Sequence, residues 1–353
     1  MNRTILIMAG GTGGHIYPGL AVADVLHAQG WKVVWLGAPK SMEAELVPKH
    51  GYSIALVNFT GVRGKGVLRL LTMPFMLLRA LGQSADAIFR YRPDVVLGMG
   101  GYITMPGGLM AAILRRPLVI HEQNSIAGMS NKVLAKLAIR VLSGFPDVLK
   151  DTLWCGNPVR ADIVALNEPQ MRYGTRNGKL NVLVVGGSLG AQALNEVLPK
   201  ALAIMSEQER PHVLHQTGKK HLEAVQQLYA QAGISADIRA FINDMADQYA
   251  NADVVICRAG ALTITELAAA GVASVLIPFP FAVDDHQTHN ARFLSEQGAA
   301  VLLPQKELSA EKLAKLLREM SRDKLLVMAQ AARKLAKPGA AQTVANVCME
   351  LAA

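Results

Sequence analysis

The stretch Thr4-Ile5-Leu6-Ile7-Met8-Ala9-Gly10-Gly11-Thr12-Gly13-Gly14 opens the chain with an apolar run that ends in glycines. Halfway along, Asn181-Val182-Leu183-Val184-Val185-Gly186-Gly187-Ser188-Leu189-Gly190 repeats the same arrangement. An apolar run, a glycine turn and a helical pattern are typical of a buried parallel strand followed by its crossover helix. The sequence therefore predicts an α/β fold in which one strand–turn–helix unit occurs twice.

Later segments of the two halves correspond as well. Second strands are expected at residues 32–37 and 212–218, and a further pair at residues 93–101 and 252–260. Each member of the further pair leads through a helix rich in small residues to another strand, at residues 118–120 and 274–277. Two Rossmann-like domains with parallel sheets that face a central cleft are the simplest explanation of this duplication.

The domain boundary is expected after Arg160. A chain of 353 residues exceeds what one hydrophobic core usually organises. Residues 168–179 are polar, contain glycines and show no periodicity, which is typical of a linker. We therefore expect an N-terminal domain at residues 1–160 and a C-terminal domain at residues 161–337, with a last helix at about 338–353 that packs back on the N-terminal domain.

Composition argues against several classes of protein. The cysteines Cys155, Cys257 and Cys348 are far apart and fit neither a disulfide framework nor a metal-ligand spacing, so no metal is expected. The apolar run at the N-terminus is too short for a signal peptide or a membrane span, which favours the cytoplasm. A net charge of +9 favours acidic partners, but the scattered basic residues show no nucleic-acid-binding signature, so no nucleic acid is expected.

Four glycine turns give the first indication of chemistry: Gly10–Gly14, Gly98–Gly101, Gly186–Gly190 and Gly260. Glycine N–H groups at a helix N-terminus bind phosphate well, because the helix dipole is positive there. A single such turn serves about equally often to pack a helix closely on its sheet. Four of them, spread over both halves at expected strand ends, indicate two phosphorylated ligands.

A dinucleotide-dependent oxidoreductase is the obvious alternative. That class requires an acidic residue about 20 positions after the glycines, at the end of the second strand, to bind the ribose. Here the second strands end in Gly37-Ala38-Pro39-Lys40 and in Thr217-Gly218-Lys219-Lys220. The missing acid argues against NAD and leaves NADP as a weak alternative.

Two polar segments of the second half suit a nucleoside and a sugar. In Ala261-Leu262-Thr263-Ile264-Thr265-Glu266, the carboxylate of Glu266 can accept hydrogen bonds from both ribose hydroxyls, although the threonines also suit plain helix capping. Asp284-Asp285-His286-Gln287-Thr288-His289-Asn290-Ala291 follows an expected strand end, a good place for sugar hydroxyls. No further cluster supports a metal site at this segment.

Six motifs, in order over nearly the whole chain, together resemble the MurG family of glycosyltransferases. They are Gly10-Gly11-Thr12-Gly13-Gly14-His15, Gly98-Met99-Gly100-Gly101-Tyr102, His121-Glu122-Gln123-Asn124, Gly156-Asn157-Pro158-Val159-Arg160, Gly186-Gly187-Ser188-Leu189-Gly190-Ala191 and Arg258-Ala259-Gly260-Ala261-Leu262-Thr263. The resemblance implies a GT-B fold and transfer of N-acetylglucosamine from UDP-N-acetylglucosamine to lipid I, giving lipid II in bacterial peptidoglycan synthesis. It implies no cofactor besides the substrates, with the donor held mainly by the C-terminal domain and the polyprenyl pyrophosphate acceptor by the N-terminal domain.

The resemblance also implies residue roles. Ser188 and Arg160 would face the donor diphosphate, and the backbone of Ile242 would contact uracil. The whole donor set is Thr12, Gly13, Gly14, Asn124, Arg160, Gly187, Ser188, Ile242, Ala261, Leu262, Thr263, Ile264, Thr265, Glu266 and Gln287, and the acceptor set is Gly13, Gly14, Gly100, Gly101 and Tyr102. Asp285-His286-Gln287 stands where some members carry two glutamines, which leaves the alignment of Gln287 and the role of His286 open.

The catalytic base is expected to be His15. Forming a β-1,4 link from a UDP-α-sugar inverts the anomeric carbon, and the acceptor hydroxyl must lose a proton. His15 follows a glycine turn near a helix N-terminus, where the dipole disfavours a charged ring, so it should stay neutral and accept that proton. Helix capping or phosphate binding is the alternative role for His15, and Glu122 is the alternative base.

Residues 61–81 are expected to meet a membrane surface. The apolar stretch from Val67 to Arg79 is interrupted by Pro74 and arginines and is too short to span a bilayer. An apolar patch rimmed by cations would bind anionic lipid headgroups at the cytoplasmic face of the bacterial inner membrane. The candidate contacts are Leu70, Phe75, Leu77, Arg69 and Arg79. A buried helix with arginines that reach out to solvent is nearly as good an explanation.

Two other functions remain open on the sequence alone. A UDP-sugar 2-epimerase of similar architecture would act on UDP-N-acetylglucosamine without a lipid. A non-catalytic nucleotide-binding membrane protein would bind UDP but would transfer no sugar to any acceptor.

Overall fold

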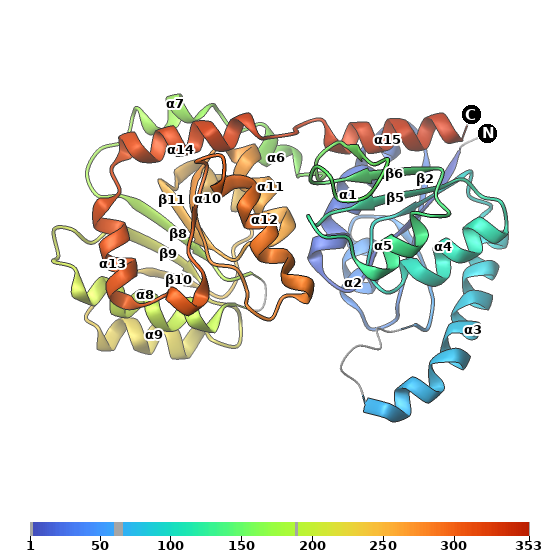
Figure 1. Ribbon diagram of the computed structural model, residues 1–353, viewed down its shortest axis with the longest axis horizontal. Coiled ribbons are helices and arrows are strands. Elements are labelled where there is room, and N and C mark those ends of the chain that lie inside the picture. The colour runs from blue at the N-terminus through green and yellow to red at the C-terminus, as the bar shows by residue number, and fades with distance from the viewer. Residues whose placement is uncertain (1–2, 60–65, 188–189, 353) are drawn as a thin grey trace. The chain divides into compact units, whose positions relative to one another are not determined.

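The computed structural model describes residues 3–59, 66–187 and 190–352, leaving aside the side chains of residues 66–71. The chain folds into two compact units (Figure 1). Unit 1 comprises Met1–Arg160 and Lys337–Ala353, and unit 2 comprises Ala161–Ala336. The last helix, α15 (Ala340–Leu351), therefore belongs with the N-terminal unit, where it packs on α1 (Gly13–Ala28).

Unit 1 is built on a parallel sheet of seven strands, in the order β3-β2-β1-β4-β5-β6-β7. Its strands are β1 (Thr4–Met8), β2 (Lys32–Gly37), β3 (Ser53–Leu56), β4 (Val95–Gly98), β5 (Leu118–Glu122), β6 (Arg140–Ser143) and β7 (Leu153–Trp154). Besides α1 and α15, its helices are α2 (Met42–Lys49), α3 (Gly66–Tyr91), α4 (Thr104–Ile113) and α5 (Met129–Leu134).

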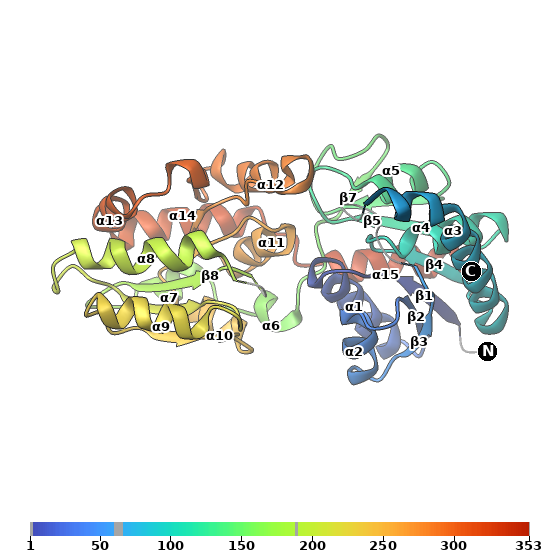
Figure 2. The same cartoon turned by 90° about the horizontal axis from the view of Figure 1, so that it is seen from below.

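Alternate side chains of β1 enter two different cores. Ile5 and Ile7 pack with residues of α1 and α15, while Leu6 and Met8 pack with residues of α3, α4 and α5. Figure 2 shows α3 beside α4, with which it is in contact. A strand covered on both faces must be apolar at every position, which explains why the chain opens with an unbroken apolar run.

The sheet of unit 2, β10-β9-β8-β11-β12-β13, is also all parallel and repeats the order of the first six strands of unit 1. Its strands are β8 (Asn181–Val185), β9 (His212–Gln216), β10 (Asp237–Arg239), β11 (Val254–Cys257), β12 (Ala273–Leu276) and β13 (Val301–Leu302). Its helices are α6 (Ala161–Val164), α7 (Pro169–Tyr173), α8 (Gln192–Ile204), α9 (Leu222–Gln231), α10 (Met245–Asn251), α11 (Ala261–Ala270), η1 (Val283–Asp285), α12 (His286–Ser295), η2 (Gln305–Glu307), α13 (Ala310–Glu319) and α14 (Arg322–Lys334).

The glycine turns lie where the strand order reverses. In unit 1 the order reverses between β1 and β4, and in unit 2 between β8 and β11. Each of these four strands runs directly into one of the predicted glycine turns. Open α/β sheets bind ligands at this point, outside the carboxyl ends of the strands. The topology therefore places all four turns where a ligand site is expected.

Two glycines allow very close backbone approaches at these points. A Cβ on Gly101 would come within 2.2 Å of the Gly10 carbonyl oxygen, and one on Gly190 within 1.9 Å of the Thr217 carbonyl oxygen. Both glycines also have positive φ angles, +88° and +80°, which side chains disfavour. Only glycine fits either position, so these residues bring neighbouring turns together.

The segment expected to be a linker contains an ordered helix. Within residues 168–179, α7 (Pro169–Tyr173) packs on α14. Arg172, only 9% exposed, donates hydrogen bonds to the backbone carbonyls of Asn167, Tyr249, Ala270 and Gly271. Pro169 and Tyr173 of the same helix are buried as well, and Tyr173 packs in the hydrophobic core of unit 2, so polar and apolar contacts together hold this short helix.

We predict that Asp253→Ala strongly destabilises unit 2. The Asp253 carboxylate is fully buried and accepts from Arg176 Nη1 at 2.8 Å, from Arg322 Nη2 at 3.2 Å and from the Asn181 N–H at 2.8 Å. Removing it leaves two arginines and an N–H without this partner, at a cost of about 3–5 kcal/mol. Urea unfolding followed by far-ultraviolet circular dichroism measures the loss.

Asp237→Ala is the matched control for that experiment. Asp237 pairs with Arg239 at 2.6 Å, but both side chains are largely exposed, and such pairs contribute little. Its unfolding midpoint should stay close to that of the unaltered protein. Equal shifts for the two variants would contradict the importance of the buried ion pair.

Candidate active site

The predicted site residues divide between the two units. Unit 1 contains Thr12, Gly13, Gly14, His15, Gly100, Gly101, Tyr102, Glu122, Asn124 and Arg160, and unit 2 contains Gly187, Ile242, Ala261, Leu262, Thr263, Ile264, Thr265, Glu266 and Gln287. Ser188 lies outside the described residues. The geometry of each group is described within its own unit.

The first two glycine turns of unit 1 form one cluster. The Tyr102 ring lies over Gly11, where an added Cβ would be 3.4 Å from the ring. Burial raises the pKa of the Tyr102 phenol, and the charge of Glu43 raises it further. Gly100 lies against His15, because an added Cβ would be 2.9 Å from its Nδ1 atom. The predicted base and acceptor residues are thus neighbours.

The side chain of His15 forms a hydrogen bond with the buried side chain of Gln123. Its Nδ1 atom lies 2.8 Å from Oε1 of Gln123, which is 1% exposed. Gln123 in turn bonds through Nε2 to Nδ1 of His121 and to the His121 carbonyl, both at 3.0 Å. Gln123 belongs to the motif His121-Glu122-Gln123-Asn124, but the sequence indicates no role for it. No local signal marks it, since its contact with His15 spans 108 residues of sequence.

Glu122 is held differently from His15. It is 1% exposed, and its Oε1 atom accepts from the Asn124 N–H at 2.9 Å. Its Oε2 atom accepts from the Gly128 N–H at 3.0 Å and from Asn131 Nδ2 at 2.9 Å. Both oxygens of the carboxylate therefore hold the loop after β5 in place. This arrangement favours His15 over Glu122 as the residue that meets a substrate proton.

Glu43 is a buried carboxylate that sequence reasoning missed. It is fully buried in the first turn of α2, where its Oε1 atom accepts from the Ala38 N–H at 3.1 Å and its Oε2 atom from the Gly11 N–H at 3.3 Å. Ser41 caps the same helix. The cap is readable from sequence, but the contact with Gly11, 32 residues away, is not.

In unit 2, the helix α11 begins directly after the turn that contains Gly260. Glu266 accepts a hydrogen bond from the Tyr249 hydroxyl, with 3.1 Å between Oε2 and the hydroxyl oxygen. Tyr249 is 1% exposed, so its position is fixed by the core. Leu262, Thr263 and Glu266 are partly accessible, whereas Ala261, Ile264 and Thr265 are buried. The accessible side of the first two turns therefore includes the carboxylate predicted for the ribose.

Gln287 joins α12 to two neighbouring loops. Its Oε1 atom accepts from the Phe279 N–H at 2.9 Å and from the Ala259 N–H at 3.2 Å. Arg258 donates to the carbonyls of Ile277 and Pro278 and to the Gln305 side chain. Both residues hold the loops that follow β11 and β12.

Gln216 links two parts of the predicted donor site. Gln216 is buried at the end of β9. Its Nε2 atom donates a hydrogen bond to the Gly187 carbonyl at 3.1 Å. Its Oε1 atom accepts from the Ile242 N–H at 2.9 Å. A uracil at Ile242 could therefore bond to the backbone carbonyl directly. It could bond to the Ile242 N–H only if the hydrogen bond from that N–H to Gln216 were broken. Gln216 was missed because a glutamine at a strand end carries no motif.

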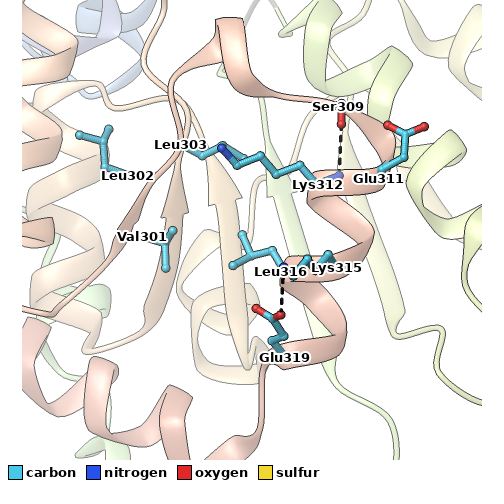
Figure 3. A pocket seen from close by; sticks show the side chains of 9 residues that line it. All are labelled: Val301, Leu302, Leu303, Ser309, Glu311, Lys312, Lys315, Leu316 and Glu319. Carbon is cyan, nitrogen blue, oxygen red and sulfur yellow. Dashed lines mark hydrogen bonds and ion pairs between the residues drawn. The ribbon is translucent and has the colours of Figure 1, made fainter.

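No part of the described chain gathers three His, Cys, Asp or Glu side chains that could hold a metal ion. The pocket in Figure 3, about 600 Å³, lies in unit 2 between β13 and α13. Its lining includes Leu302, Leu316 and Lys312, and Lys312 is paired with Glu307 at 2.6 Å. None of the predicted site residues lines it, so it is separate from the site.

Of the predicted membrane segment, residues 66–81 form the N-terminal part of α3, and residues 61–65 lie outside the described residues. Phe75 is 76% exposed and Arg79 is exposed, while Leu77 packs partly against the core of unit 1. Leu78, which was not in the predicted set, is 66% exposed. The side chains of Leu70 and Arg69 lie outside the described residues. In the described ranges, no helix has both the length and the apolar character that a bilayer crossing requires.

Sequence comparisons place both units in one family. Residues 5–143 match the Glycosyltransferase family 28 N-terminal domain, and residues 181–344 match the Glycosyltransferase family 28 C-terminal domain. A protein from Aromatoleum aromaticum, named UDP-N-acetylglucosamine--N-acetylmuramyl-(pentapeptide) pyrophosphoryl-undecaprenol N-acetylglucosamine transferase, is 60% identical over 351 residues, covering 99% of this chain and 98% of its own. A protein of the same name from Burkholderia pseudomallei is 58% identical, covering 99% of this chain and 96% of its own.

Solved structures give a matching result. The crystal structure of Acinetobacter baumannii MurG is 42% identical, with a TM-score of 0.85 and 99% of each chain covered. The glycosyltransferase of kitacinnamycin, at 17% identity, has a TM-score of 0.72 with 99% of each chain covered. At 17% identity, the similarity to the kitacinnamycin glycosyltransferase shows only that the two proteins share a fold.

We predict that unit 1 loses stability as the pH falls from about 6.5 to 4. Burial lowers the pKa of the His121 imidazole to about 4. The ring titrates near 6.5 when the chain is unfolded, so in this interval the unfolded state binds more protons and gains stability. The expected loss is about 3 kcal/mol at pH 4. Tryptophan fluorescence during urea unfolding reports on unit 1, because Trp31, Trp35 and Trp154 all lie there.

His121→Gln should show a shallower pH dependence over the same interval, whatever its absolute stability, since the substituted side chain does not titrate. His50→Gln is the control, because His50 is exposed and its removal should leave the slope unchanged. An unchanged slope in His121→Gln would contradict the prediction.

Proposed function

The chain belongs to glycosyltransferase family 28, and on that premise we propose that it transfers N-acetylglucosamine from UDP-N-acetylglucosamine to the C4 hydroxyl of an undecaprenyl-pyrophosphoryl N-acetylmuramyl-pentapeptide. Its two units, each with a parallel sheet, form the GT-B architecture, as the sequence predicts. The resemblance to the MurG family is confirmed by relatives that are 60% and 58% identical. The single observation that carries the proposed reaction is this identity over nearly the full length of the chain.

The reaction needs a base for the acceptor hydroxyl, and we assign that role to His15. Its Nδ1 atom is engaged inward with Gln123, which leaves Nε2 as the nitrogen for a substrate. Attack of the hydroxyl oxygen on C1 of N-acetylglucosamine breaks the bond from C1 to the diphosphate, while the hydroxyl proton passes to Nε2. The configuration at C1 inverts, and UDP leaves. Histidine is the side chain that most often performs such a proton transfer in enzymes.

The leaving diphosphate needs fixed positive charge and dipoles. The N-terminus of a helix offers N–H groups without intrahelical partners and the positive end of its dipole. We assign the diphosphate to the residues that precede α8, Gly187 and Ser188, and to the cation of Arg160. Groups that are already oriented stabilise a developing charge without reorganisation. The proposal requires no cofactor besides the two substrates.

The uridine is assigned to the loop at Ile242 and to α11. Glu266 would accept from the ribose hydroxyls, and its bond from Tyr249 orients the carboxylate for them. Asn124 and Gln287 would contact sugar hydroxyls. In the case of Gln287, Oε1 already accepts from two backbone N–H groups, so its Nε2 atom is the proposed donor to the sugar.

We also propose that unit 1 binds the cytoplasmic face of the inner membrane through α3 and its neighbours. The exposed residues Phe75 and Leu78 lie on α3, Ile113 ends α4, and Met129 begins α5, all at 66–76% exposure. The helix α4 contacts both α3 and α5, so these side chains belong to adjoining helices. Arg79, Arg115, Arg116 and Lys132 lie on or next to these helices. Apolar side chains among cations suit an anionic lipid surface.

The proposed function predicts transfer of labelled sugar from UDP-N-acetylglucosamine to a lipid I analogue by the purified protein. Within that assay, His15→Ala should lower kcat about 10²-fold or more, because the base is gone. His27→Ala is the matched control, since His27 is exposed in the last turn of the same helix and should leave kcat unchanged.

Three results would contradict parts of this proposal. Conversion of the donor to a 2-epimer without a lipid would favour an epimerase. Binding of UDP with no turnover would favour a binding protein. A decrease of only a few-fold in His15→Ala would move the role of base to Glu122.

The membrane proposal predicts that Phe75→Asp with Leu78→Asp reduces sedimentation with vesicles that contain anionic phospholipid. A charge at these positions would have to enter the apolar part of the interface, which is unfavourable. Met171→Asp is the control, because Met171 is an apolar residue of unit 2 with 64% exposure. Circular dichroism verifies that the variants fold. Unchanged sedimentation of the double variant would overturn this surface.

A further inference from the structure

We propose that Gln123 and His121 form a hydrogen-bond relay that fixes His15 in one tautomer, with its proton on Nδ1 and its lone pair on Nε2. The two residues act as positioning residues and do not touch the substrate. The relay rests on the proposed function in one respect, which is that His15 is the base. Its structural part, the tautomer, is testable without any substrate.

The direction of the relay is set at its inner end. The Nε2 atom of His121 lies 2.9 Å from the Gly156 carbonyl oxygen, which can only accept. His121 must therefore donate from Nε2. The ring is fully buried, and burial lowers its pKa to about 4, so the ring is neutral near pH 7. A neutral imidazole that is protonated on Nε2 has its lone pair on Nδ1.

The second step fixes the side-chain amide of Gln123. The His121 Nδ1 lone pair and the His121 carbonyl oxygen both lie 3.0 Å from Gln123 Nε2. An NH2 group has two hydrogens for these two acceptors. The flipped amide would place Oε1 against both lone pairs and form neither bond. The hydrogen-bond network thus assigns the orientation of the amide.

The third step fixes His15. With Nε2 turned inward, Gln123 presents Oε1 to His15 Nδ1 at a distance of 2.8 Å. An amide oxygen only accepts, so His15 carries its proton on Nδ1. In the neutral ring Nε2 then has the lone pair, which is the form that a general base requires. Without a partner at Nδ1, the ring would exchange between both tautomers, and only one of them accepts a proton at Nε2.

Close packing keeps the relay in place. Gln123 and His121 are both almost completely buried, and Asn157 Nδ2 donates to the Gln123 carbonyl at 3.0 Å. A Cβ on Gly100 would lie 2.9 Å from His15 Nδ1 and 3.3 Å from Gln123 Oε1. The absence of a side chain at Gly100 therefore leaves room for this hydrogen bond. In serine proteases a carboxylate on Nδ1 orients the histidine in the same way, and here a neutral amide has that place.

The first test measures the tautomer directly. The enzyme is labelled with 15N in its histidine rings, and the ring nitrogens are assigned by comparison with His15→Ala. In the neutral form, NMR should show His15 protonated on Nδ1 in the unaltered enzyme and a mixture of tautomers in Gln123→Met. A predominant Nε2–H form in the unaltered enzyme would overturn the proposal, whatever the enzyme catalyses.

The second test separates positioning from a general effect on folding. In the transfer assay, Gln123→Met should lower kcat about 10-fold to 100-fold and leave the KM for UDP-N-acetylglucosamine within about two-fold. Ser84→Ala is the matched control, since Ser84 is also fully buried in unit 1 and loses a hydrogen bond to the Ala80 carbonyl without touching the relay. That control should retain kcat.

Gln123→Glu gives a signature that a merely structural role would not produce. A carboxylate next to Nδ1 still accepts its proton but also stabilises the charged ring, so the acid limb of the kcat profile should move to higher pH by about one unit. A profile that superimposes on that of the unaltered enzyme would contradict the relay, as would full kcat in Gln123→Met. Failure of the unaltered enzyme to transfer sugar would instead contradict the proposed function, and the NMR result would stand apart from it.

Discussion

The approach of Gly101 to the Gly10 carbonyl is the contact on which the site in unit 1 depends. A Cβ at Gly101 would come within 2.2 Å of that oxygen, so any other residue would push apart the turns that follow β1 and β4. The same junction places Gly100 against His15 and Tyr102 over Gly11. Separating the turns would also displace His15 from Gln123. A backbone contact without any side chain thus determines where the proposed base lies.

Neutral amide side chains connect the parts of both candidate sites. Gln123 joins His15 to His121, Gln216 joins the Gly187 turn to Ile242, and Gln287 joins the loops after β11 and β12. An amide has both a donor and an acceptor, so it can link unlike groups without adding charge. This property suits the proposed phosphate sites, since an added carboxylate would repel an anion and a buried cation would need its own partner.

The sequence predicts the parts of the fold that follow from local pattern. Strand β2 lies at Lys32–Gly37 as expected, and all four glycine turns follow strands, because buried parallel strands are continuous apolar runs that end in glycines. It does not predict α7, a helix of five residues held by a buried arginine and a buried tyrosine, or the short edge strands β7 and β13. It also gives no role to Gln123, Gln216 or Glu43, since each of them bonds to a segment at least 29 residues away.

The contacts of Glu43 bear on which N–H groups of the first glycine turn meet an anion. The Gly11 N–H already donates to the Glu43 carboxylate, and Ala38 donates to its other oxygen. A phosphate at Gly11 would have to compete with a buried negative charge, which is unfavourable. The first N–H groups of α1, at Gly13 and Gly14, have no intrahelical partner and lie at the positive end of the dipole. An anion such as the proposed acceptor pyrophosphate is therefore better accommodated at the start of α1 than at Gly10 and Gly11, which shape the turn.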